Sequence, residues 1–76
     1  MVSSVEVVRE NILKFLSTNG EKATGEIARG VGKPTHIAKY HLTRLLIDGL
    51  VERRFATPKV IMWKITDKGR DALKQH

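Results

Sequence analysis

Residues 34–54 read PTHIAKYHLTRLLIDGLVERR, and they carry the most informative pattern in the chain. At 100° per residue, Ala38, Leu42 and Leu45 fall on one stripe of a helix. Gly49 is a helix stop signal, and strand-forming residues follow it at once. The stretch therefore predicts a helix with one buried face, joined by a tight turn to a β-strand.

The opposite stripe of this helix is polar and basic. It carries hydroxyl, imidazole, phenol and cationic groups, because it consists of His36, Tyr40, Thr43 and Ile47 with Lys39 and Arg44 on its shoulders. Such side chains can contact base edges and phosphates. The same pattern is also typical of an ordinary solvated helix face, so the helix alone leaves both interpretations open.

The position of the charge favours the nucleic-acid interpretation. The chain has 14 Lys and Arg against 8 Asp and Glu, a net charge of +6. Residues 29–64 hold eight of the bases and two of the acids, which gives +6, and the remainder holds six of each, which gives zero. This segregation is expected of a surface that binds a polyanion. We expect no membrane partner, because no long basic helix has a bulky apolar face.

Size and composition exclude several classes of protein. Seventy-six residues make a single domain, 1–76, with a small core. The absence of cysteine excludes disulfides, thiolate zinc sites and cysteine nucleophiles. His36 and His41 are five residues apart, the wrong spacing for one helix face, so we expect no metal site and place His41 at the edge of the core. No set of nucleophile and base is visible, so we expect neither an enzyme nor a cofactor.

No targeting segment is apparent either. No apolar run approaches the ~20 residues that span a bilayer. The N-terminal residues MVSSVE lack the basic start and apolar core of a signal peptide. We therefore expect a cytoplasmic protein.

The sequence before residue 34 predicts two helices. Ser3 or Ser4 can cap the first, which ends at Asn19-Gly20. Its apolar positions follow helical spacing, and they are Val5, Val8, Ile12, Leu13 and Leu16. Residues 21–23 form a connector or a one-bridge strand, and Thr24 can cap a short second helix.

The sequence after residue 49 predicts a β-hairpin and a last helix. Residues 50–55 and 60–65 have strand character, and a loop over residues 56–59 joins them. We expect Trp63 in the core, and residues 66–69 to cap the last helix. The order helix, helix-turn-helix, hairpin, helix predicts an α+β fold. It is a winged helix-turn-helix with a three-helix core, a two- to three-stranded β-hairpin wing and a short C-terminal helix.

Two segments, 38–54 and 63–73, resemble the winged-helix transcription regulators of bacteria and archaea. In those families a helix ending in Gly-Leu-Val leads into the wing, and Thr-(Asp/Glu)-Lys-Gly opens the next helix. The small size and the runs at 24–28 and 38–42 look most like the short regulators of fimbrial operons. The resemblance implies a DNA-binding regulator and leaves its target open.

A second resemblance is to the winged-helix domains that bind left-handed Z-form nucleic acid. The residues that carry it are 12–16, 22–24, Thr57-Pro58 and Trp63. Those domains use an Asn and a Tyr one turn apart on the third helix, and Lys39 and Thr43 stand at the matching positions here. Tyr40 is present in a different register. These differences favour the first resemblance.

The sequence thus predicts a sequence-specific regulator that binds double-stranded DNA, with the third helix in the major groove and the wing on the backbone. The predicted contacts are Lys33, Thr35, His36, Lys39, Tyr40, Thr43, Arg44, Arg53, Arg54 and Lys59. Strand alternation puts Arg53 and Arg54 on opposite faces, so we expect one of them to matter and the other to be nearly silent.

The rival from another class is a protein-interaction module inside a larger complex. Fold alone does not fix function, and outward Tyr40, Ile47 and Phe55 would then form an apolar docking patch. Salt dependence of duplex binding distinguishes the two. The sequence leaves open whether the chain acts as a homodimer or with a partner regulator.

Overall fold

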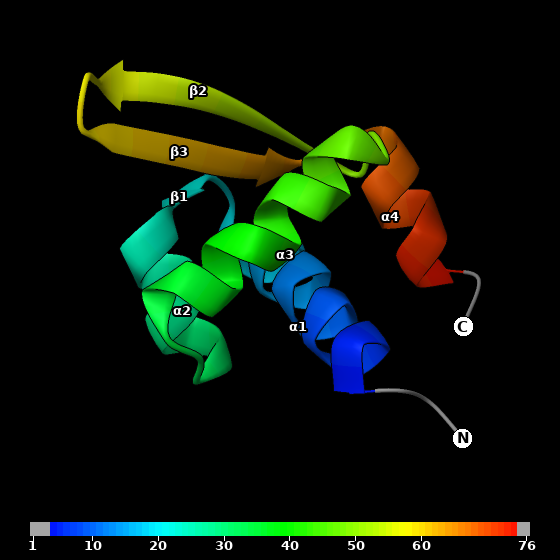
Figure 1. Cartoon of the computed structure of the whole chain (residues 1–76). Coiled ribbons are helices and arrows are strands. Elements are labelled where there is room, and N and C mark those ends of the chain that lie inside the picture. Colours follow the sequence, from blue (N-terminus) through cyan, green and yellow to red (C-terminus); the bar gives the residue numbers. More distant parts are fainter. Residues whose placement is uncertain (1–3, 75–76) are drawn as a thin grey trace.

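The computed structural model describes residues 4–74 (Figure 1). Its elements are α1 (Ser4–Asn19), β1 (Lys22–Ala23), α2 (Thr24–Val31), α3 (Thr35–Ile47), β2 (Val51–Thr57), β3 (Val60–Ile65) and α4 (Asp67–Lys74). The strands form one antiparallel sheet in the order β1-β3-β2. Figure 1 shows the hairpin of β2 and β3 reaching out beyond the helices, with α4 at the opposite end. The order of elements and the α+β class are as predicted.

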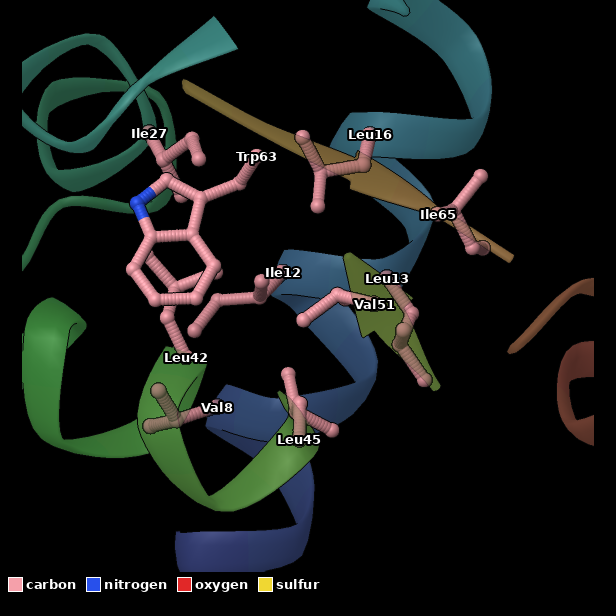
Figure 2. Packing of buried hydrophobic residues seen from close by; sticks show 10 residues of the cluster. All are labelled: Val8, Ile12, Leu13, Leu16, Ile27, Leu42, Leu45, Val51, Trp63 and Ile65. Atoms are coloured by element: carbon pink, nitrogen blue, oxygen red, sulfur yellow. The ribbon is translucent and has the colours of Figure 1, made fainter. Parts of the chain in front are cut away.

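One core joins the helices to the sheet. Trp63 of β3 is fully buried at its centre, as predicted, between side chains of α1, α2 and α3 (Figure 2). The buried cluster consists of Val8, Ile12, Leu13, Leu16, Ile27, Leu42, Leu45, Val51, Trp63 and Ile65. Because Ala38, Leu42 and Leu45 are fully buried, the apolar stripe of α3 faces inward and its basic stripe faces solvent.

The end of α3 follows the predicted signal. The helix ends at Ile47, and Gly49 adopts φ 77°, a left-handed conformation that disfavours any residue with a Cβ. The backbone N–H of Leu50 donates to the carbonyl of Leu45 at 2.9 Å, which closes the helix before β2 begins. This tight closure fixes where the hairpin leaves α3.

The hairpin has a shorter turn than predicted. β2 continues through Thr57, so Ala56 and Thr57 belong to the strand and the predicted loop over 56–59 is wrong at these two residues. Phe55 pairs with Ile61 and Thr57 pairs with Val60, which leaves Ala56 as an extra residue in the ladder. Such a bulge accommodates the odd residue and lets a two-residue turn close the hairpin.

The predicted cap of α2 is wrong, and one of the two predicted caps of α1 lies outside the described residues. Thr24 does not cap α2, because Ala23 occupies the cap position and Thr24 Oγ1 accepts a hydrogen bond of 2.8 Å from Trp63 Nε1. The N-terminal turn is instead supported by Glu26, whose Oε1 accepts from the Ala23 N–H at 3.2 Å. Ser3 lies outside the described residues, and α1 begins at Ser4.

The first turn of α1 differs from the prediction, and the cap of α4 agrees with it. Val5 is exposed, so the apolar face of α1 begins at Val8 rather than at Val5. Thr66 caps α4 as predicted, since its Oγ1 accepts a hydrogen bond of 3.0 Å from the Gly69 N–H.

Within residues 4–74, no helix is long and apolar enough to cross a membrane.

Candidate nucleic-acid interface

The outer face of α3 presents most of the predicted contact residues to solvent. Thr35, His36, Lys39, Tyr40 and Arg44 are all exposed, and so is Lys33 in the turn before the helix. Thr43 is half-buried, and its hydroxyl donates a hydrogen bond of 2.8 Å to the carbonyl of Lys39. Because its proton is used within the helix, Thr43 can offer a partner a methyl group or an acceptor lone pair, but no free donor.

A hollow lies between α3, the start of α2 and strand β3. Its volume is about 340 Å³, and it is lined by Ala23, Thr24, Gly25, Thr35, Lys39, Lys59, Val60 and Ile61. Lys39 comes from α3 and Lys59 from the hairpin turn. The fold therefore brings two cations that are twenty residues apart in sequence to the rim of one concave surface.

Strand alternation separates Arg53 from Arg54, as predicted. Arg53 stands opposite Trp63 in the β2–β3 ladder, so it shares the face that Trp63 turns toward the helices. It is exposed, and its guanidinium lies 5.8 Å from the centre of the Phe55 ring. Arg54 stands opposite Met62 on the other face of the sheet.

Arg54 is held by a carboxylate from the connector before β1. Its Nε donates to Glu21 Oε2 at 3.0 Å and its Nη2 donates to Glu21 Oε1 at 2.7 Å. These hydrogen bonds, with the charge of Arg54, lower the pKa of the Glu21 carboxyl, and they raise the pKa of Arg54. Arg54 is thus occupied, whereas Arg53 has no carboxylate partner within the described part of the chain.

The pattern of ion pairs sharpens the charge asymmetry. The pairs among the described residues are Arg9–Asp48, Lys14–Glu10, Lys22–Glu26, Arg54–Glu21 and Lys64–Glu52. Among residues 4–74, no carboxylate pairs with the remaining cations of segment 29–64. They are Arg29, Lys33, Lys39, Arg44, Arg53 and Lys59. The unbalanced positive charge therefore belongs to the helix-turn-helix and the hairpin.

His41 is a buried polar residue of α3. It is only 6% exposed, and its Nδ1 has no hydrogen-bond partner among the residues that the structure describes. Burial lowers the pKa of the imidazole, and the charges of Arg9 and Lys33 lower it further. The Tyr40 ring lies edge-on to the imidazole, and the centroids of the two rings are 5.2 Å apart. His41 thus lies among the buried residues of α3, next to the core cluster, in surroundings that disfavour its charged form.

Comparison with known proteins identifies this arrangement of helices and hairpin. No family model and no curated protein matches the chain. Solved structures do match it, among them the following three. The Zalpha domain of PKZ from Carassius auratus, in complex with Z-DNA, is 23% identical with a TM-score of 0.78. ZitR from Lactococcus lactis, in complex with DNA, is 23% identical with a TM-score of 0.79, and a MarR-family regulator from Silicibacter pomeroyi is 20% identical with a TM-score of 0.84.

The fold is a winged helix. The chain aligns over 84% of its length with all of the Zalpha chain, over 100% with 51% of ZitR, and over 90% with 47% of the Silicibacter protein. It thus spans about half the length of ZitR and of the Silicibacter protein. The β2–β3 hairpin is the wing, and α3 occupies the position of the predicted third helix.

Nine of the ten predicted contact residues fall into three groups, and the tenth, Thr43, is half-buried on α3. Thr35, Lys39 and Lys59 share the hollow between α3 and the wing. Others are exposed without lining that hollow, and these are Lys33, His36, Tyr40, Arg44 and Arg53. Arg54 is bound to Glu21, a residue that the sequence analysis did not single out. No local motif marks Glu21, because its pairing with Arg54 depends on the strand order.

Proposed function

We propose that this winged helix is a sequence-specific transcription regulator that binds double-stranded DNA, with α3 in the major groove and the wing on the backbone. One observation carries the proposal. Six cations of segment 29–64 have no carboxylate partner within residues 4–74, and two of the six meet at one hollow between helix and wing. A concave, positively charged surface of this kind suits a polyanion.

The proposed contacts divide by chemistry. Thr35, His36, Lys39 and Tyr40 stand on the first half of α3, the part of a recognition helix that reaches base edges. Lys39 can donate to guanine O6 and N7, and the Thr43 methyl can meet a thymine methyl. Four of the other unpaired cations are predicted contact residues and would bind phosphates, namely Lys33, Arg44, Arg53 and Lys59.

We also propose that residues 1–76 act as one domain in the cytoplasm, without enzymatic activity or a cofactor. The solved structures that the chain resembles are described as DNA complexes or transcription regulators, which supports a binding role. Association with a second copy or a partner regulator would join two half-sites about one helical turn apart. If sequences selected from a random duplex pool are palindromic, the protein binds DNA as a pair of identical copies.

Two other candidates have an observation in their favour. A protein-docking domain is favoured by the exposure of Tyr40, Ile47 and Phe55, whose exposed fractions are 60%, 69% and 59%. Binding of left-handed DNA is favoured by the alignment with the whole Zalpha chain. That second candidate predicts that the protein inverts the circular dichroism of an alternating dC–dG duplex at low salt.

Selection from a random duplex pool, followed by salt titration, tests the proposal. If about five phosphates are neutralised, log K should fall with log salt at a slope near −4 to −5. Lys39→Ala should weaken binding, whereas Lys74→Ala, which removes the same charge from α4, should leave specific binding nearly unchanged. A slope near zero would favour the docking domain and contradict the proposal.

A further inference from the structure

The Arg54–Glu21 pair ties the wing to the body of the protein outside the core. Arg54 lies in the middle of β2, and Glu21 lies in the connector between α1 and β1. Strand β3 separates β2 from β1, so the Arg54 side chain reaches across the sheet, past its partner Met62. Both carboxylate oxygens accept a hydrogen bond, at 3.0 and 2.7 Å. Such a two-point contact restricts orientation as well as distance.

The other ion pair on this face of the wing is looser. Lys64 Nζ lies 3.5 Å from Glu52 Oε2, and the two side chains are 59% and 61% exposed. These two residues face each other within the hairpin, so their pair does not connect the wing to anything else. The single ammonium of Lys64 can turn to a phosphate, whereas Glu21 accepts from two of the five N–H groups of Arg54. A phosphate can therefore bind the Nε–Nη2 edge of Arg54 with two hydrogen bonds only if it displaces Glu21.

We propose that Glu21 is a specificity-determining residue, which withholds Arg54 from the DNA backbone and fixes the pose of the wing. This inference rests on the proposed function. Phosphate contacts carry no sequence information, so a released Arg54 would strengthen binding to any duplex. In a specific complex the base contacts of α3 already set the pose of the protein, so the gain there is smaller. Release of Arg54 therefore lowers the ratio of specific to random affinity.

Glu21→Gln tests this role, with Glu52→Gln as the matched control. Each variant removes one negative charge from the same face of the sheet, but only Glu21→Gln breaks the two-point contact. For random duplex, the slope of log K against log salt should be about one unit steeper for Glu21→Gln than for Glu52→Gln. One added phosphate contact corresponds to about eightfold tighter binding at ~0.1 M salt, since K varies as about the −0.9 power of salt.

A second substitution shows that the effect belongs to Arg54. Adding Arg54→Gln to Glu21→Gln should remove the extra unit of slope, whereas Arg54→Gln alone should leave the wild-type slope nearly unchanged. Both side chains lie at the surface, so thermal melts should show all variants folded. Equal slopes for Glu21→Gln and Glu52→Gln, with wild type binding normally, would overturn this inference alone. A wild type without salt-dependent duplex binding would overturn the proposed function and the inference with it.

Discussion

Gly69 of α4 lies against the carbonyl oxygen of Leu50, so closely that a Cβ on Gly69 would stand 2.2 Å from that oxygen. The same carbonyl accepts a hydrogen bond of 3.1 Å from the Thr66 N–H. Leu50 is the last of the three residues between α3 and β2, so the last helix packs against the point where the wing leaves α3. The approach of the two backbones is possible because residue 69 has no side chain.

Gly69→Ala should therefore destabilise the fold. The clash involves backbone at Leu50 and the buried Ile65, whose Cγ1 would be 2.7 Å away, so no flexible side chain can relieve it. We expect a loss of about 1–3 kcal/mol or more in the free energy of unfolding, measured by urea denaturation. Gly25→Ala is the matched control, because a Cβ there meets open space in α2. It should raise stability, by up to about 1 kcal/mol.

Thr24→Val should destabilise the protein through the indole of Trp63. Trp63 is fully buried, and its Nε1 donates to Thr24 Oγ1 at 2.8 Å, so the isosteric valine leaves this donor unpaired. Leaving a buried donor unsatisfied costs about 1–3 kcal/mol. Chemical denaturation followed by tryptophan fluorescence measures it. Thr18→Val, at an exposed position of α1, should change stability little, and equal effects of the two variants would contradict the assigned role.

Lys39→Ala and Tyr40→Ala should impair specific binding more than folding. Both side chains are exposed on α3, opposite the buried stripe. Loss of a base contact should cost about 1–3 kcal/mol of binding free energy and relax the sequence preference, measured by titration of selected and scrambled duplexes. Leu42→Ala, on the buried stripe, should instead cost about 2–5 kcal/mol of folding stability. Unchanged affinity and unchanged preference would show that this face does not read DNA.

The wing cations should differ from one another in their effect on affinity. Arg53→Ala and Lys59→Ala should each weaken all duplexes about equally and reduce the salt slope by about one unit. Arg54→Ala should be nearly silent, since its guanidinium is held by Glu21. The measurement is the slope of log K against log salt for each of the three variants on random duplex. A wing variant that keeps its random affinity but changes the preferred sequence would move the reading surface from α3 to the wing.

Stability should fall in mild acid because of His41. Burial, with the charges of Arg9 and Lys33, lowers its pKa in the folded state below the ordinary 6.5. The unfolded chain then binds more protons, so the free energy of unfolding falls as pH drops below about 6.5 and levels off below the folded-state pKa. Melts between about pH 7.5 and about pH 5.5 measure this, and His41→Leu should flatten the dependence. His36→Gln, on the exposed face of the same helix, should keep it.

Local patterns predicted the parts of the fold that local physics determines. The buried stripe of α3 follows from a 3.6-residue period, and Gly49 ends the helix by its own conformation. Thr24 shows where such reasoning fails. A threonine before a helix is normally its cap, but here Trp63, 39 residues later, takes the hydroxyl as its acceptor. The long-range contact overrides the local rule.

The candidate site also has features that the local sequence predicts and one that it does not. The exposed face of α3 could be predicted, because the buried stripe fixes its opposite. The alternation of Arg53 and Arg54 could be predicted as well, since it is a property of any strand. Which of the two is occupied depends on the order β1-β3-β2, which brings Glu21 across the sheet to Arg54. Nothing near either residue in the sequence encodes that order.

The uneven distribution of charge also has a consequence for how quickly a complex forms. A molecule whose unpaired cations belong to the helix-turn-helix and the wing, with a balanced remainder, has an electric dipole, and the field of a polyanion rotates such a dipole before contact. Under the proposed function, the protein meets DNA with α3 and the wing already leading, and fewer encounters are lost to wrong orientations. Added salt should then slow association far more than it speeds dissociation.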